Sequence, residues 1–234
     1  MVKQVLNYHD VQLHDADVAL FGAFQWLNDN AINFYFQYVY HTVCLSSSAA
    51  CDVLLVDPAV VSCMMLQCDD DDEYADLGRG LRVQEKALCL LPVNDNQSFD
   101  SESSHWSLLV YENQRFVHYD SSAGHNTTAA KKIARTFLQL LSASGVDNVP
   151  TWSSGLFVND RDAPQQQNGY DCGMYVLVVA EFLCRQRCRR EVEGAAAISL
   201  RDYATADRVT ALRLEIPRIV QRLQEDKAFA VQRS

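Results

Sequence analysis

Two different spacings of hydrophobic residues divide the chain into predicted helices and predicted strands. Apolar positions three and four residues apart place Ile133, Phe137, Leu140 and Leu141 on one face of a helix over residues 126–142. The same spacing, together with capping residues and prolines at helix starts, predicts further helices over residues 29–40, 57–67, 172–183 and 204–223, the last kinked or broken near Pro217.

Short runs rich in Val, Leu, Tyr and Phe predict strands over residues 52–56, 86–93, 105–111, 115–120 and 156–158. Only Glu112, Asn113 and Gln114 separate the third run from the fourth, so these two runs are expected to form a hairpin. Helices and strands are mixed without a regular strand–helix–strand rhythm. This order indicates an α+β architecture, with a central, mostly antiparallel sheet flanked by helices, and a single domain over residues 1–234.

The composition is that of a globular protein with an acidic surface. Hydrophobic residues make up 48% of the 234 positions, and the formal net charge is −10. This charge gives no indication of nucleic-acid or anionic-membrane binding. The first ten residues lack the apolar segment of a signal peptide, and no apolar run is long enough to cross a bilayer, so we expect a cytoplasmic or nuclear protein.

Two charged segments stand out from this background. The five acids of residues 69–73 are expected to form a solvated loop. The Arg-rich segment that follows Cys184 is expected to be a solvated helix end, where cations suit the negative end of the helix dipole.

The eight cysteines give no sign of a metal site. Neither Cys63 with Cys68 nor Cys184 with Cys188 has the short paired spacing that structural zinc requires. Because the chain is not a small secreted domain, buried reduced thiols are favoured over disulfides. We therefore expect no metal and no other cofactor.

Cys172 has a setting that differs from that of an ordinary buried cysteine. It follows the turn-forming pair Asn168-Gly169 and the helix-capping residue Asp171, and it precedes the apolar run of residues 174–183. The cysteine is therefore predicted in the first turn of a buried helix. Backbone N–H groups and the positive end of the helix dipole favour a thiolate at that place.

A thiolate nucleophile also needs a base and a group that orients the base. The predicted hairpin brings His105, at the start of one strand, beside Asp120, at the end of the next. His118 is the competing base, because strand alternation puts it on the same face as Asp120. We interpret His118 as a structural neighbour, since its root on the strand lies about 6–7 Å from that of Asp120.

Four blocks of the chain are similar to those of the ubiquitin-like-modifier proteases, the Ulp or sentrin-specific cysteine proteases. They are Trp26–Asp29, His105–Leu108, His118–Ser121 and Gln166–Tyr175, in the order of the family. The segment Leu91–Asn96 resembles most the deneddylase branch, which is specific for modifiers of the Nedd type. The resemblance implies a papain-like cysteine protease fold and one catalytic domain.

The resemblance also implies a role for each matching residue. Cys172 would be the nucleophile, His105 the general base, Asp120 its orienter and Gln166 the oxyanion-hole donor, with Gln165 and Gln167 as alternatives because three glutamines leave the register open. Trp106 would cover the narrow diglycine tail of the substrate. Trp26 and Asp29 match positions on the tail-binding side.

The function implied is that of a thiol protease that cleaves after the C-terminal Gly-Gly of a ubiquitin-like modifier, of the Nedd type first and the Sumo type second. Its partners would be the modifier and its conjugates, bound by a monomer. Two alternatives remain open: a non-catalytic modifier-binding protein, and an effector protease or acyltransferase of the same fold.

Overall fold

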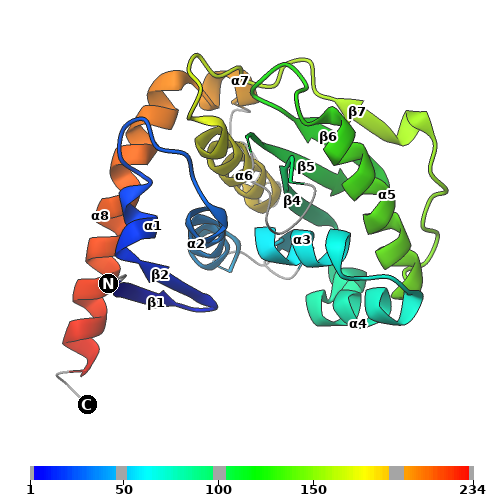
Figure 1. The fold of residues 1–234 in the computed structure, drawn as a ribbon, viewed down its shortest axis with the longest axis horizontal. Coiled ribbons are helices and arrows are strands. Elements are labelled where there is room, and N and C mark those ends of the chain that lie inside the picture. The colour runs from blue at the N-terminus through cyan, green and yellow to red at the C-terminus, as the bar shows by residue number, and fades with distance from the viewer. Residues whose placement is uncertain (1–2, 46–51, 97–103, 190–197, 232–234) are drawn as a thin grey trace.

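The computed structural model describes residues 3–45, 52–96, 104–189 and 198–231 (Figure 1). Its centre is a five-stranded sheet in the order β3-β4-β5-β6-β7. The strands are β3 (Val53–Leu55), β4 (Leu88–Asn94), β5 (Trp106–Glu112), β6 (Arg115–Tyr119) and β7 (Phe157–Asn159). The three central strands are antiparallel, as predicted, whereas each edge strand runs parallel to its neighbour. The predicted α+β class is confirmed.

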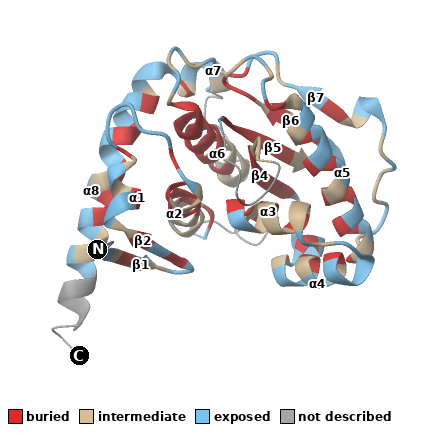
Figure 2. Cartoon of the chain, in the orientation of Figure 1, coloured by how far each residue is buried: buried red, intermediate tan, exposed pale blue. Residues whose placement is uncertain are grey.

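Helices cover both faces of this sheet (Figure 1). On one face α6 (Cys172–Arg189) packs against the sheet, and α2 (Asp29–Val39) and α8 (Ala206–Val231) pack against α6 in the same hydrophobic core. On the other face α3 (Pro58–Leu66) and α5 (Thr127–Ala143) pack against the sheet, and α4 (Asp71–Leu81) packs against α5. Successive residues of β4 alternate between the two cores: Leu88 and Leu90 belong to the first, Cys89 and Leu91 to the second. Figure 2 shows the buried residues on the strands and on the inner sides of the helices.

Local signals explain where the predicted helices begin. The side chain of Asn28 accepts a hydrogen bond from the N–H of Ala31 at the start of α2, and Asp57 accepts one from Ala59 at the start of α3. Pro58 occupies the first turn of α3, as predicted. α5 and α6 also lie where the hydrophobic spacing places them.

The acidic run of residues 69–73 is not the solvated loop that the sequence predicts. Asp70 is the N-cap of α4 and accepts a hydrogen bond from the N–H of Glu73, while the Glu73 carboxylate accepts one from the N–H of Asp69. The remaining acids lie in the first turn, where negative charge is favoured by the helix dipole. The run is therefore a helix start.

The Arg-rich segment is only partly a solvated helix end. Arg185 pairs with Glu181, and Arg187 bridges Asp52 and Glu112, which ties the end of α6 to the sheet. Residues 190–197 of the segment, and residues 97–103 of the polar loop before β5, lie outside the described residues.

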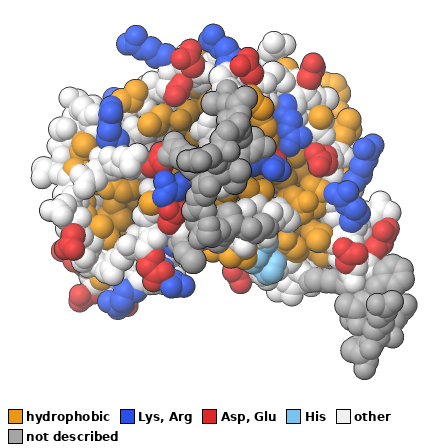
Figure 3. Space-filling view, turned by 180° about the vertical axis from the view of Figure 1, so that it is seen from behind, with side chains coloured by type: hydrophobic (Ala, Val, Ile, Leu, Met, Phe, Trp, Pro, Cys, Tyr) orange, Lys and Arg blue, Asp and Glu red, His pale blue; other side chains and the backbone are white. Residues whose placement is uncertain are grey.

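The face opposite to that of Figure 1 carries positive and negative side chains interspersed (Figure 3).

Three further differences from the sequence prediction concern element boundaries. Glu112 pairs with Arg115, so the hairpin loop between β5 and β6 has two residues instead of three. Both loop residues, Asn113 and Gln114, have a left-handed backbone conformation, as tight hairpin turns require. α8 continues through Pro217 without a break. The amphipathic pattern missed a short hairpin of β1 (Gln4–Tyr8) and β2 (Val11–His14), the helices α1 (Asp15–Ala19) and α7 (Leu200–Tyr203), and the helical segments Tyr40–Cys44, Val83–Glu85 and Ser154–Leu156.

None of the described helices is long and apolar enough to cross a membrane. The seven cysteines within the described residues are free thiols, and Cys51 lies outside them. No cluster of three or more His, Cys, Asp or Glu side chains in this part of the chain is arranged to hold a metal ion.

Candidate active site

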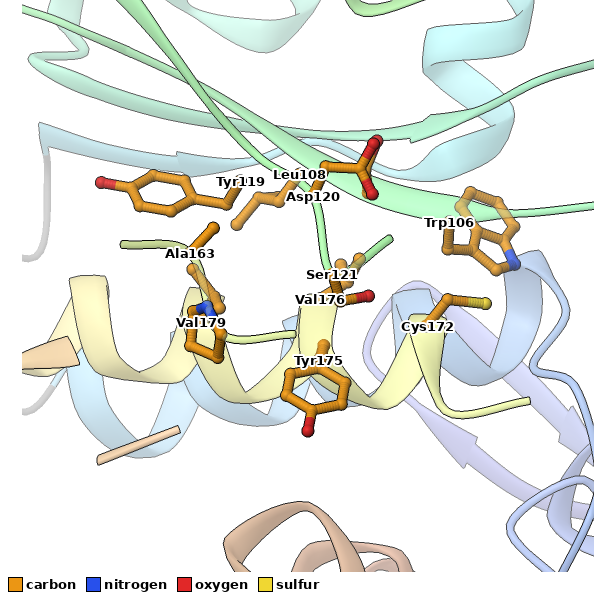
Figure 4. A pocket seen from close by; sticks show the side chains of 12 residues that line it. Trp106, Leu108, Tyr119, Asp120, Ser121, Ala163, Cys172, Tyr175, Val176 and Val179 are labelled. Carbon is orange, nitrogen blue, oxygen red and sulfur yellow. The ribbon is translucent and has the colours of Figure 1, made fainter. Parts of the chain in front are cut away.

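Cys172 is the first residue of α6, as the turn and the apolar run predict. The helix begins with a hydrogen bond from the N–H of Tyr175 to the carbonyl of Asp171, and the cysteine is 2% exposed. Next to it, a Cβ on Gly173 would lie 3.0 Å from the Leu27 side chain, so the glycine lets the segment before α2 approach the helix start closely. Figure 4 shows Cys172 at the beginning of α6, close to Trp106.

The two ends of the β5–β6 hairpin bring His105 and Asp120 together, as predicted. His105 immediately precedes β5, and Asp120 immediately follows β6. The Nε2 atom of His105 lies 2.7 Å from Oδ1 of Asp120, and both side chains are almost completely buried. The histidine also interacts with Cys172 through a hydrogen bond. The three side chains therefore form one hydrogen-bonded chain in the order aspartate, histidine, cysteine.

The turn after β6 holds Asp120 as an anion. Burial alone would raise the pKa of the Asp120 carboxyl, but hydrogen bonds from His105 and from the backbone N–H groups of Asn126 and Ser122 outweigh burial and lower it. These two N–H groups donate over 2.9 Å to different carboxylate oxygens. The carboxylate is thus fixed in charge and in orientation.

Burial disfavours the charged form of His105, but hydrogen bonds to Asp120 and Cys172 dominate and raise the pKa of the imidazole to about 9. A histidine with this pKa is an imidazolium at neutral pH. It can stabilise a thiolate beside it and can later donate its proton to a leaving group.

His118 is in a different chemical situation, although it belongs to the same hairpin. It is completely buried, with Nδ1 2.8 Å from Oδ1 of Asn159 and Nε2 2.9 Å from Oγ of Ser107. Burial lowers the pKa of His118 below its usual value. Both ring nitrogens face these neutral partners, so the geometry agrees with the interpretation of His118 as a structural neighbour.

The three glutamines before the cysteine occupy different positions. Gln166 accepts a hydrogen bond from Oγ of Ser121 and donates one to the carbonyl of Asn168, so its amide is fixed between the turn after β6 and the loop that enters α6. Gln165 donates to the carbonyls of Asp120 and Ala163, and Gln167 is exposed. Of the three side-chain amides, the one of Gln166 is bonded both to the turn after β6 and to the loop before Cys172. This position agrees with the choice of Gln166 as the oxyanion donor.

The three residues assigned to substrate binding differ in position and exposure: Trp106 lines a cavity together with Cys172, Trp26 adjoins Leu27 next to the start of α6, and Asp29 is the first residue of α2. Trp26 is 48% exposed, whereas Trp106 is 4% exposed and donates from its indole nitrogen to the carbonyl of Leu27. Asp29 opens α2, and burial together with the charge of Asp57 raises the pKa of its carboxyl. Trp26 is open to a substrate, but Trp106 as a roof over the tail stays a prediction because this structure buries its ring.

Two residues that support the site have no signal in the sequence alone. The side-chain amide of Asn126, 1% exposed, donates to the carbonyls of His105 and Val93. Arg213, on α8, pairs with the Asp171 carboxylate next to Cys172 over 2.7 Å. Both depend on contacts between segments far apart in the sequence, and neither lies in a recognisable motif.

A small cavity lies between α6 and the β5–β6 hairpin, with the candidate nucleophile at one end of it (Figure 4). Trp106, Asp120 and Cys172 line one end of it, and Leu108, Tyr119 and Val179 line the rest. Most of the lining is apolar. The interactions among Cys172, His105 and Asp120 are therefore strengthened, because charges attract more strongly in apolar surroundings than in water.

Comparison with known proteins identifies the family of the chain. A model described as the Ulp1 protease family, C-terminal catalytic domain, matches residues 25–215. The chain is 35% identical to sentrin-specific protease 8 of Rattus norvegicus over 87% of this chain and 90% of the relative, and 31% identical to NEDD8-specific protease 1 of Arabidopsis thaliana over 77% and 75%.

Solved structures share the fold at low sequence identity. The C-terminal Ulp1 protease domain in complex with Smt3, the yeast ortholog of SUMO, aligns with a TM-score of 0.62 at 17% identity, covering 95% of this chain and 89% of the other. A de-sumoylating protease aligns with a TM-score of 0.73 at 12% identity, covering 98% and 94%. The predicted papain-like protease fold is therefore confirmed, and the chain belongs to the Ulp1 family of ubiquitin-like-protein proteases, which are cysteine-type peptidases.

Proposed function

We propose that this protease cleaves after the C-terminal Gly-Gly of a ubiquitin-like modifier of the Nedd type, removing the modifier from conjugates or maturing its precursor. Relatives named sentrin-specific protease 8 and NEDD8-specific protease 1 support this choice of modifier. The observation that carries the chemistry is the buried His105, bonded on one side to Asp120 and on the other to Cys172 at the start of a helix.

In the first step His105 takes up the proton of the Cys172 thiol, which leaves a thiolate beside an imidazolium. The sulfur attacks the carbonyl carbon of the terminal glycine, a C–S bond forms, and the carbonyl electrons move to the oxygen. We assign the stabilisation of this oxyanion to the Gln166 amide, whose Nε2 lies 2.6 Å from the Asn168 carbonyl and carries a second N–H group that could donate to it. His105 then gives its proton to the leaving amine as the C–N bond breaks.

The second half of the reaction reverses these roles. The modifier is held as a thioester on Cys172, and neutral His105 takes a proton from the water that attacks the thioester carbonyl. The C–S bond breaks, the modifier leaves with a free C-terminal carboxylate, and the thiolate–imidazolium pair is restored. All of the residues to which these steps are assigned, Cys172, His105, Asp120 and Gln166, lie within the described part of this chain.

A panel of electrophile-tipped modifiers tests the proposal. Probes built on Nedd-type, Sumo-type and ubiquitin modifiers are incubated with the wild type and with the Cys172→Ala variant. The proposal expects a covalent adduct with the Nedd-type probe and none in the variant. An adduct with the Sumo-type probe instead would make this a Sumo-type protease. No adduct with any probe would favour a non-catalytic binding protein or an effector acting on other proteins.

A further inference from the structure

Phe24 has two features that the fold alone does not account for. Its side chain is 74% exposed, and its backbone has a φ of 62°. The left-handed region is rare for bulky residues, because the side chain crowds the backbone there. Exposed aromatic surface is also unfavourable in water. A residue that combines both costs is typical of a functional position rather than of a packing position.

The Phe24 ring has one aromatic neighbour, and that neighbour belongs to the nucleophile loop. Its centroid lies 5.2 Å from that of Tyr170, and the two rings meet edge to face at 69°. Tyr170 lies two residues before Cys172, so their Cα atoms are at most about 7 Å apart. We call the two rings of Phe24 and Tyr170 the aromatic shelf.

A buried arginine fixes both halves of the shelf. Arg213 of α8 donates to the carbonyls of Leu20 and Gly22, in the loop between α1 and α2, over 2.9 and 3.0 Å. The same guanidinium donates to the carbonyl of Tyr170 and to the carboxylate of Asp171. Figure 1 shows this loop beside α8, and Figure 2 colours most of it as exposed. The shelf is therefore preorganised, and the charge of its support is neutralised by Asp171.

The loop leads outward from the nucleophile to the shelf. Leu27 touches the helix start at Gly173, Trp26 follows on the exposed side, and Phe24 lies two residues further away. A bound substrate chain in extended conformation advances about 3.3 Å per residue. A chain whose last carbonyl lies at Cys172 would thus pass the shelf about three to five residues before the cleaved bond.

We propose that the aromatic shelf binds an aliphatic side chain of the modifier's extended C-terminal tail, about three to five residues before the cleaved bond. Two aromatic rings favour an apolar side chain over a charged one, and the nearby Arg213 guanidinium is paired with Asp171. This inference rests on the proposed function, because it takes a modifier tail as the substrate. It adds Phe24 and Tyr170 to the residues that determine specificity.

The test uses Nedd-type modifiers that carry a fluorogenic group at the C-terminal glycine, with each of the three residues before Gly-Gly replaced in turn by Leu or Ser. The wild type is expected to prefer Leu over Ser about tenfold in kcat/KM at one of these positions. Phe24→Asn removes the ring but keeps a residue that tolerates the left-handed backbone. In this variant the preference is expected to disappear through KM, while kcat stays within about twofold.

Leu214→Gln is the matched control, because Leu214 is another exposed hydrophobic side chain, 62% exposed, on the helix that carries Arg213. It should keep the wild-type preference, and both variants should keep melting temperatures within about 3 °C of the wild type. A wild type without a Leu preference, or a Phe24→Asn variant that retains it, would overturn the shelf. Failure of the wild type to cleave any of these substrates would instead overturn the proposed function.

Discussion

Two buried histidines of one hairpin have opposite properties, and their surroundings explain the difference. At the open end, His105 is bonded to the Asp120 anion and to Cys172, and these bonds raise its pKa to about 9. Within the sheet, His118 is bonded to Ser107 and Asn159, and burial lowers its pKa. Burial by itself favours the neutral ring in both places. The raised pKa of His105 therefore comes from its bonds to Asp120 and Cys172, which His118 lacks, and not from burial.

The largest expected effect separates the two histidines directly. His105→Ala should lower kcat/KM by about three orders of magnitude or more, because it removes the only proton carrier proposed next to Cys172. His118→Gln should leave kcat/KM within about fivefold and lower the melting temperature instead, since it disturbs two buried hydrogen bonds. Both variants are assayed on one fluorogenic modifier substrate. Equal losses of activity would contradict the assignment of the base.

Asp120→Asn tests the charged partner on its own. The variant should lose about two to four orders of magnitude in kcat, because the amide no longer favours the imidazolium. Asp120 raises the pKa of His105, so the wild type is expected to lose activity as the pH rises through about 9. In the variant this alkaline limb should move to lower pH. A limb that stays in place would show that another group sets it.

Gln166→Ala sharpens the comparison on the side of the nucleophile. An oxyanion donor acts mainly in the transition state, so kcat should fall about a hundredfold with KM nearly unchanged. Gln165→Ala and Gln167→Ala are the controls within the same triplet. If either control loses more kcat than Gln166→Ala, the oxyanion role belongs to that neighbour.

The smallest effect is expected from Asn126→Ala. Its side-chain amide holds the carbonyls of His105 and Val93, while its backbone N–H to Asp120 survives the substitution. We expect kcat to fall about tenfold with KM unchanged, because the imidazole is less well fixed. Asn126→Asp, which offers no N–H donor to these carbonyls, should not restore the rate. If the Asn126→Ala variant has a normal kcat and a lower melting temperature, Asn126 has only a structural role.

Short-range signals explain why the core of the site was predictable. A cap, a turn and an apolar run place Cys172 at a helix start, and two strands with a short connection bring His105 beside Asp120. Each inference depends on residues that are close in the sequence. The same holds for α2 and α3, whose caps Asn28 and Asp57 act on the next turn of the chain.

The features that the sequence did not predict either depend on contacts between distant segments or arise from a residue pattern that fits two different structures. Arg213 meets Leu20 and Asp171 across 193 and 42 positions of sequence, so no local pattern indicates the contact. The acids of residues 69–73 suit both a solvated loop and a helix start, and the Asp70 cap decides for the helix. The bond from the Trp106 indole to the carbonyl of Leu27 joins residues 79 positions apart, so no local pattern indicates it.

The central claim is that His105 carries the catalytic proton and His118 does not, and NMR of the histidine side chains measures this directly. Imidazole nitrogen shifts are followed from about pH 5 to pH 10 in the wild type, with resonances assigned from His105→Gln and His118→Gln variants. We predict that His105, coupled to Cys172, loses its proton near pH 9, and that His118 titrates below its usual value or remains neutral throughout. A raised pKa at His118 together with an ordinary one at His105 would contradict the account.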